Sequence, residues 1–123
     1  MAKTVAVVLG GSSAIDTHRL SEGLRMSVGL VLRKHDVHVL LFDKASLATL
    51  KKKPDFLKKH ETAKHINALI MLKRKVWVER HSLTDLQILE EEKLKGVEVK
   101  DRNEMLDVLA NADVVMRYEV DAK

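Results

Sequence analysis

Cysteine is absent from the 123 residues of this chain. Its absence excludes a disulfide framework, a thiolate metal site and a cysteine nucleophile, because each of these needs a sulfhydryl side chain. Aromatic residues make up only 3% of the sequence, and no stretch interleaves them with basic residues. Although the net charge is +4, we therefore expect no nucleic-acid partner.

Long apolar runs are also missing. The longest, such as VAVVL and GLVL, fall far short of the roughly 20 residues that a transmembrane helix needs, so we expect no membrane span. The N-terminus imitates a signal peptide, with Lys3 before an apolar run. That run is too short for a signal peptide and is typical of a first strand that ends in a glycine turn. We expect a cytoplasmic protein.

The chain has one proline and five glycines, and no stretch rich in Gly, Pro or Ser divides it. A content of 46% hydrophobic and 33% charged residues is typical of a folded globular protein. No repeat of fixed length is present. The length suits one core, so the sequence predicts a single domain over residues 1–123.

Two hydrophobic periods alternate along the chain. Short segments rich in β-branched residues predict strands at 4–9, 37–42, 76–78, 97–99 and 113–118. Apolar residues spaced three and four apart predict helices between them. These helices cover 20–34, a region after Asp43 that is interrupted at Pro54 and resumes to Ile70, a stretch from Ser82 to Gly96, and a last one after Asp101.

Pairs of polar residues mark helix starts at capping-box spacing: Ser13 with Asp16, Ser82 with Asp85, and Asp101 with Glu104. Gly96 suits a left-handed residue that closes the third helix. Strands that alternate with helices predict a parallel sheet covered on both faces. The fold class is therefore α/β, a three-layer α/β/α domain with a five-stranded parallel sheet, whose strand order the connection lengths do not fix.

The first helix carries more apolar residues than one sheet-facing stripe needs. Leu24, Met26, Val28, Leu30 and Val31 surround much of its cylinder. We expect part of this surface to meet another subunit, although partly exposed apolar residues are also common on monomers.

Polar residues follow the predicted strands at their carboxyl ends, where open parallel sheets bind their ligands. We therefore expect a ligand or partner site at this edge of the sheet. Its candidate residues are Ser12, Ser13, Asp16, Asp43, Glu79, Arg80, His81 and Arg117.

The chemistry of this edge stays open. The stretch LGGSSAID precedes a helix and could hold an anion, but it matches neither the GxGxxG nor the GxxxxGK[ST] nucleotide pattern. Consecutive strand residues point to opposite sides, so Glu79, Arg80 and His81 cannot all share one pocket. The six histidines lack metal-ligand spacing, and we expect no metal, cofactor or catalytic residue.

Several motifs together resemble the DsrE/DsrF/TusC family of sulfur-relay proteins. They are the EGL-containing first helix, a second strand that ends at an acidic residue, a KPD segment, and a third strand followed by SL. The resemblance implies cytoplasmic α/β subunits that form trimers or heterohexamers and pass persulfide sulfur between cysteines. Members often carry the cysteine in the form WVC at the end of the third strand, where this chain has Trp77, Val78 and Glu79.

These observations leave three hypotheses for the function. The leading hypothesis is a noncatalytic DsrE-like subunit or interaction protein, in a homo-oligomer or hetero-oligomer associated with intracellular sulfur handling, because a carboxylate cannot hold sulfane sulfur. The alternative is a module that binds a small anion or nucleotide with Ser12, Ser13 and either Arg80 or Arg117. The third, an enzyme with Glu79 or His81 as acid or base, has least support, because nothing pairs these residues with a nucleophile.

Overall fold

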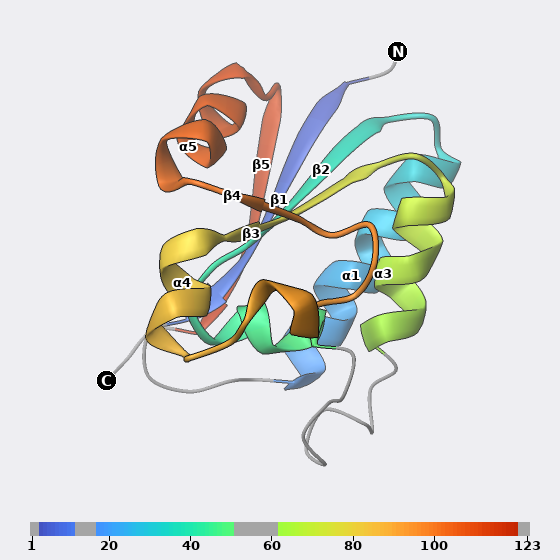
Figure 1. Ribbon diagram of the computed structural model, residues 1–123. Helices are drawn as coiled ribbons and strands as arrows, with labels where there is room; N and C mark the ends of the chain where they lie inside the picture. Colours follow the sequence, from blue (N-terminus) through green and yellow to red (C-terminus); the bar gives the residue numbers. More distant parts are fainter. Residues whose placement is uncertain (1–2, 12–16, 51–61, 121–123) are drawn as a thin grey trace.

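A computed structural model of the chain describes residues 3–11, 17–50 and 62–120. Five strands form one sheet in the order β4-β3-β2-β1-β5, and every neighbouring pair is parallel. The strand bounds are β1 Thr4–Gly11, β2 Asp36–Leu41, β3 Lys75–Glu79, β4 Glu98–Lys100 and β5 Val114–Val120. The predicted parallel sheet is confirmed, and its order places β5 beside β1 at the end of the sheet (Figure 1).

Helices lie on both faces of the sheet, as predicted (Figure 1). α1 and α3 pack together on one face, and α5 lies on the other. The connections from β1 to β4 proceed in one direction across the sheet, and the connection from β4 to β5 returns in the opposite direction. Because crossovers between parallel strands are right-handed, this reversal places α5 on the other face. The bounds are α1 Thr17–Leu32, the 3-10 turn η1 Asp43–Thr49, α3 Thr62–Met71, α4 Arg80–Asp85, the 3-10 turn η2 Glu90–Glu92 and α5 Arg102–Asn111.

The core divides between the two faces of the sheet. Alternate strand residues form the larger cluster under α1 and α3, and the residues between them meet α5 in a smaller one. The central strands are thus buried on both sides, which explains their almost continuous apolar sequences. In the described part of the chain, no helix is long and apolar enough to span a membrane. The larger cluster includes Val5, Val7, Leu9, Val37, Val39, Leu41, Val76 and Val78, and the smaller one consists of Leu40, Trp77 and Met105.

The EGL motif of α1 has a packing explanation. A Cβ atom on Gly23 would lie 2.5 Å from Leu9 of β1 and 3.1 Å from Tyr118 of β5, so any larger residue would require the Leu9 side chain or the helix to move. Leu24 beside it is fully buried, and Glu22 before it is exposed. The motif therefore sets the distance between α1 and the β1–β5 end of the sheet.

The predicted long helix from Ser82 to Gly96 is wrong. α4 ends at Asp85, and Gln87 takes a left-handed φ of 58° that stops the helix. The chain then turns toward η1, where Leu94 N–H donates to the Thr49 carbonyl at 2.6 Å. Hydrogen bonding to another segment thus replaces helical bonds that LQILEEEKLKG could have formed.

The predicted helix caps have mixed outcomes. Asp101 is the N-cap residue of α5, although its side chain makes no capping bond. Ser82 is not the N-cap of α4, because this helix begins earlier, with Glu79 as its N-cap. Gly96 has the expected left-handed φ of 96°, but at the approach to β4 and not at a helix end. The predicted Ser13–Asp16 cap and the interruption at Pro54 lie outside the described residues.

Candidate functional site

Glu79 is the last residue of β3 and one of the most buried polar groups of the described residues, with 1% of its surface exposed. Ser82, one turn further along in α4, donates its hydroxyl to Glu79 Oε1 at 2.6 Å. The same hydroxyl oxygen accepts the backbone N–H of Asp43 at 2.8 Å. This relay joins the ends of β2 and β3, because Asp43 follows β2 at the start of η1.

Arg102, the first residue of α5, completes the environment of Glu79. Its Nε donates to Glu79 Oε2, and its Nη2 donates to Glu79 Oε1 at 3.3 Å. The guanidinium also lies over the Phe42 ring, with Cζ 5.9 Å from the ring centroid. The Arg102 side chain is nevertheless 59% exposed, so one part is fixed by Glu79 and another part faces solvent.

The ionisation of this pair follows from its contacts. Burial raises the pKa of the Glu79 carboxyl, but hydrogen bonds from Arg102 and Ser82 and the charges of Arg102 and His81 outweigh it. The net pKa of Glu79 lies below its ordinary value of 4.5. The hydrogen bond to Glu79 and the charge of that carboxylate raise the pKa of Arg102. The two groups thus form an ion pair at neutral pH.

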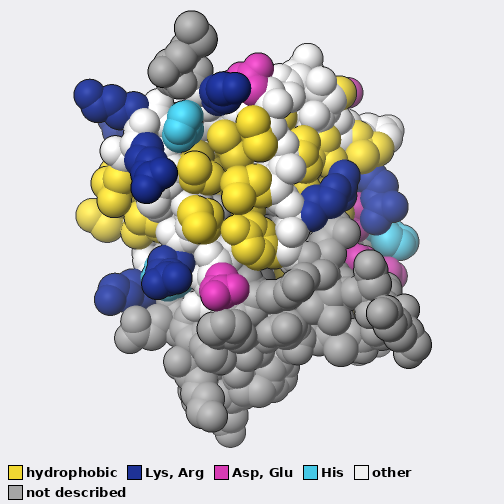
Figure 2. Space-filling model, turned by 180° about the vertical axis from the view of Figure 1, so that it is seen from behind, with side chains coloured by type: hydrophobic (Ala, Val, Ile, Leu, Met, Phe, Trp, Pro, Cys, Tyr) yellow, Lys and Arg dark blue, Asp and Glu magenta, His cyan; other side chains and the backbone are white. Residues whose placement is uncertain are grey.

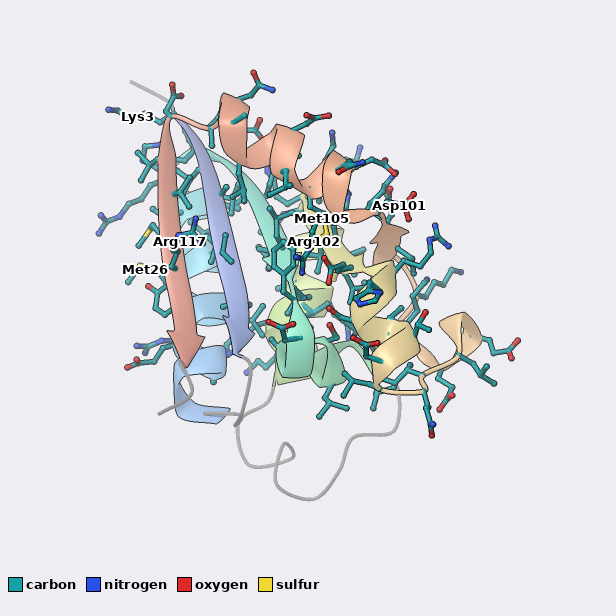
Figure 3. All side chains as sticks on the ribbon, turned by 90° about the vertical axis from the view of Figure 1, so that its left-hand side faces the viewer. Lys3, Met26, Asp101, Arg102, Met105 and Arg117 are labelled. Atoms are coloured by element: carbon teal, nitrogen blue, oxygen red, sulfur yellow. The ribbon has the colours of Figure 1, made fainter. Side chains whose placement is uncertain are left out.

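A cleft of about 300 Å³ opens beside this ion pair. Figure 3 looks onto this face of the sheet: α5 crosses the upper part, and Arg102 at its start and Arg117 on β5 lie on opposite sides of β1. Arg117 and Val8 are register partners in the β1–β5 pair. The cleft is therefore built where strands that are far apart in sequence become neighbours. Its lining residues are Val8, Phe42, Asp43, Arg102, Leu106, Leu109 and Arg117.

The structure brings together only some of the predicted site residues. Asp43 and Arg117 line the cleft, and Glu79 lies behind Arg102. Arg80 instead donates its Nε to Asp101 Oδ1 at 3.0 Å. His81 has a 74% exposed side chain, and its Nε2 lies 3.3 Å from the Asp85 carboxylate one turn away.

The remaining candidates, Ser12, Ser13 and Asp16, lie outside the described residues. Glu79 is buried, whereas Arg80 and His81 are exposed. The reason is not the strand alternation that we expected, because β3 ends at Glu79 and Arg80 begins α4.

Sequence reasoning missed Arg102 and the apolar wall of the cleft. Arg102 follows β4 by two positions and opens α5. The first turn of a helix after a parallel strand lies at the same sheet edge as the strand ends. The position of Arg102 in the sequence was therefore enough to make it a candidate site residue. Its pairing with Glu79 could not be read from the sequence, because β3 and β4 had no assigned positions in the sheet.

The arrangement suits binding better than acid or base catalysis. Both oxygens of Glu79 accept hydrogen bonds, and the carboxylate is ionised, so it has little capacity to take a proton from a substrate. His81 faces solvent beside Asp85, away from the cleft lining. Among the described residues, no group of three or more His, Asp or Glu side chains is placed to hold a metal ion.

Comparisons with known proteins show the fold, and one of them shows the family. None of the curated proteins matches the chain in sequence. Among solved structures, the YchN protein of E. coli is similar over 95% of this chain and 99% of its own, with 22% identity and a TM-score of 0.79. A protein of unknown function, MTH1491 from Methanobacterium thermoautotrophicum, is similar over 92% and 97%, with 11% identity and a TM-score of 0.70.

These likenesses show a shared fold. The family assignment comes from the sequence, because the DsrE/DsrF-like family matches residues 3–118, nearly the whole chain. The chain belongs to the DsrE/DsrF-like family.

Proposed function

We propose that this chain is a thiol-free DsrE-like subunit, which associates with other DsrE-like subunits in cytoplasmic sulfur handling and does not itself carry persulfide. One observation carries the proposal. At the end of the third strand, where the resemblance implies a cysteine, stands a buried Glu79 that is ion-paired to Arg102 and hydrogen-bonded to Ser82.

The chemistry of that position supports the loss of sulfur transfer. Persulfide exchange needs a thiolate that attacks or carries the outer sulfur atom, and a carboxylate has no equivalent reaction. The 123 residues hold no other cysteine to take over the step. The fixed contacts of Glu79 are those of a structural ion pair, which keeps the scaffold of the site without its thiol.

The surface around β5 supports association. β5 lies at the end of the sheet order and, among the described strands, pairs only with β1. Figure 2 shows hydrophobic side chains gathered on the face seen from behind, with lysine and arginine around them. Met26 of α1 is 46% exposed, and Val114 and Val115 of β5 are each 37% exposed. An apolar surface beside an open strand edge is typical of an interface with another subunit.

Sedimentation velocity of the purified chain, alone and mixed with a cysteine-bearing DsrE-like protein, tests this proposal. We expect species larger than the 13.9 kDa chain. Met26→Glu should weaken association, because it places a charge in the apolar surface. Met71→Glu is the matched control, since Met71 is 82% exposed at the end of α3. A wild-type protein that stays monomeric with and without the second protein contradicts the proposal.

A second candidate function is the binding of a small anion at the carboxyl ends of the strands. It is favoured by one observation, that Arg102 and Arg117 line the same cleft. A thermal-shift series with phosphate, sulfate and organic acids tests it, and unchanged unfolding temperatures with every anion would remove its support.

A further inference from the structure

We infer that the cleft between α5, β1 and β5 binds a small organic monocarboxylate with an apolar body, whose carboxylate is held by Arg102 and Arg117. The inference rests on the second candidate function, because it names the class of anion. It also gives Glu79 a positioning role, since this residue fixes the guanidinium of Arg102.

Arg102 is prepared for a ligand before one arrives. Glu79 holds its Nε and Nη2, and the Phe42 ring lies under its guanidinium, so the group is restrained from two directions. Its side chain is still 59% exposed. A restrained guanidinium loses little conformational freedom when it donates to a carboxylate, and this lowers the cost of binding.

Arg117 supplies a second guanidinium from another element of the fold. It stands opposite Val8 in the β1–β5 register and lines the same cleft as Arg102. Figure 3 shows the two side chains separated by β1, so they approach the cleft from different sides. A guanidinium has several N–H donors in a planar fork and can hold a carboxylate while it keeps another contact.

The charges around the cleft favour a monoanion. Glu79 and Asp43 offset much of the charge of the two arginines, and Asp43 lies close enough to raise the pKa of Arg102. A phosphate dianion gains little from a group of charges that is nearly neutral, and the Asp43 carboxylate repels a dianion more strongly than it repels a monoanion. A carboxylate can still use the directional N–H donors, because these do not depend on a large net charge.

The rest of the cleft predicts an apolar body. Val8, Leu106 and Leu109 line it together with Phe42, and Leu106 is 49% exposed. A ligand that covers Leu106 removes apolar surface from water, which is favourable. The volume of about 300 Å³ is at the lower limit for small-molecule sites. A single ring or a short alkyl chain therefore suits this space.

Benzoate and its neutral isostere benzamide test the inference on the intact chain. Isothermal titration calorimetry measures affinity, and ¹⁵N chemical-shift mapping locates binding. The variants are Arg117→Gln and Leu106→Asn in the cleft, with Arg33→Gln as the control, because Arg33 is exposed just before β2, at the opposite end of the strands. Thermal unfolding checks that each variant is folded.

We expect benzoate to bind with a dissociation constant of about 1 mM, and benzamide to bind about tenfold more weakly. Arg117→Gln should weaken benzoate binding about five- to tenfold, and Leu106→Asn about threefold, while Arg33→Gln changes it less than about twofold. The chemical-shift changes caused by benzoate should centre on Val8, Phe42 and Leu109.

Equal binding of benzoate and benzamide, or equal effects of Arg33→Gln and Arg117→Gln, would overturn the inference. A titration with inorganic phosphate distinguishes failure of the carboxylate inference from failure of the anion-binding function on which it rests. If phosphate binds through Arg117 and benzoate does not, the carboxylate class is wrong and anion binding stands. If neither anion binds, both are wrong.

Discussion

The Glu79–Arg102 pair predicts an asymmetric response to mutation. Glu79 is 1% exposed and Arg102 is 59% exposed, so the loss of either partner leaves the other in a very different environment. In Arg102→Met, a buried carboxylate keeps Ser82 as its remaining side-chain donor. In Glu79→Met, the guanidinium of Arg102 can turn into water.

The magnitudes follow from this difference. Removal of one partner of a buried ion pair costs about 3–5 kcal/mol, but water can reach Glu79 where Arg102 was, so we expect about 2–3 kcal/mol for Arg102→Met. For Glu79→Met we expect about 1 kcal/mol, because only modest hydrogen bonds are lost. The double variant should cost about 1 kcal/mol, since no buried charge remains, which gives a coupling energy of about 2–3 kcal/mol.

Urea denaturation at pH 7, followed by circular dichroism, measures all four proteins of this cycle. Arg102→Met should also unfold about 10 °C lower in a thermal scan. Arg80→Met is a suitable control, because Arg80 forms an exposed ion pair with Asp101 that contributes little. If Glu79→Met costs as much as Arg102→Met, or if the two losses simply add, an unpaired buried charge is not the cause of the loss in Arg102→Met.

Two further predictions concern pH and packing. Because Glu79 binds a proton less readily when folded than when unfolded, the free energy of unfolding should fall as the pH drops from about 4.5 through its lowered pKa. In acid denaturation curves, Glu79→Gln should lack the part of this fall in stability that comes from protonation of Glu79. An identical pH dependence of the wild type and Glu79→Gln would count against the ion pair. Gly23→Ala should cost about 1–3 kcal/mol in urea denaturation, because its methyl group would meet Leu9 and Tyr118. Gly29→Ala, with nothing within 4 Å, should be neutral or stabilising by up to about 1 kcal/mol, and equal losses in both variants would contradict the packing argument.

The strands and most helices could be predicted from the sequence, because their apolar residues recur at the period that the sheet and its two helical layers require. The stretch from Ser82 to Gly96 could not. Its local pattern is helical, but Leu94 bonds to Thr49, and Leu50 pairs with Lys93 in a short bridge. Such contacts between distant segments outweigh local helix propensity and leave no periodic signal.

The candidate site also contains residues that could be predicted from the sequence and one contact, between Arg102 and Glu79, that could not. Asp43, Glu79 and Arg117 could be found because each lies at or near the end of a strand, and parallel strands end at one edge. The contact of Arg102 with Glu79 depends on the strand order. Only when β4 lies beside β3, and α5 starts from β4, does this residue reach Glu79. Connection lengths along the chain do not contain that information.

We propose that this chain works as a thiol-free subunit within an assembly of DsrE-like proteins. The decisive experiment is native mass spectrometry of the protein, purified at its natural level from the organism that encodes it. We expect complexes with further DsrE-like chains, at least one of which carries the family cysteine, and no added sulfur on this chain. Recovery of only the isolated 13.9 kDa chain would contradict it.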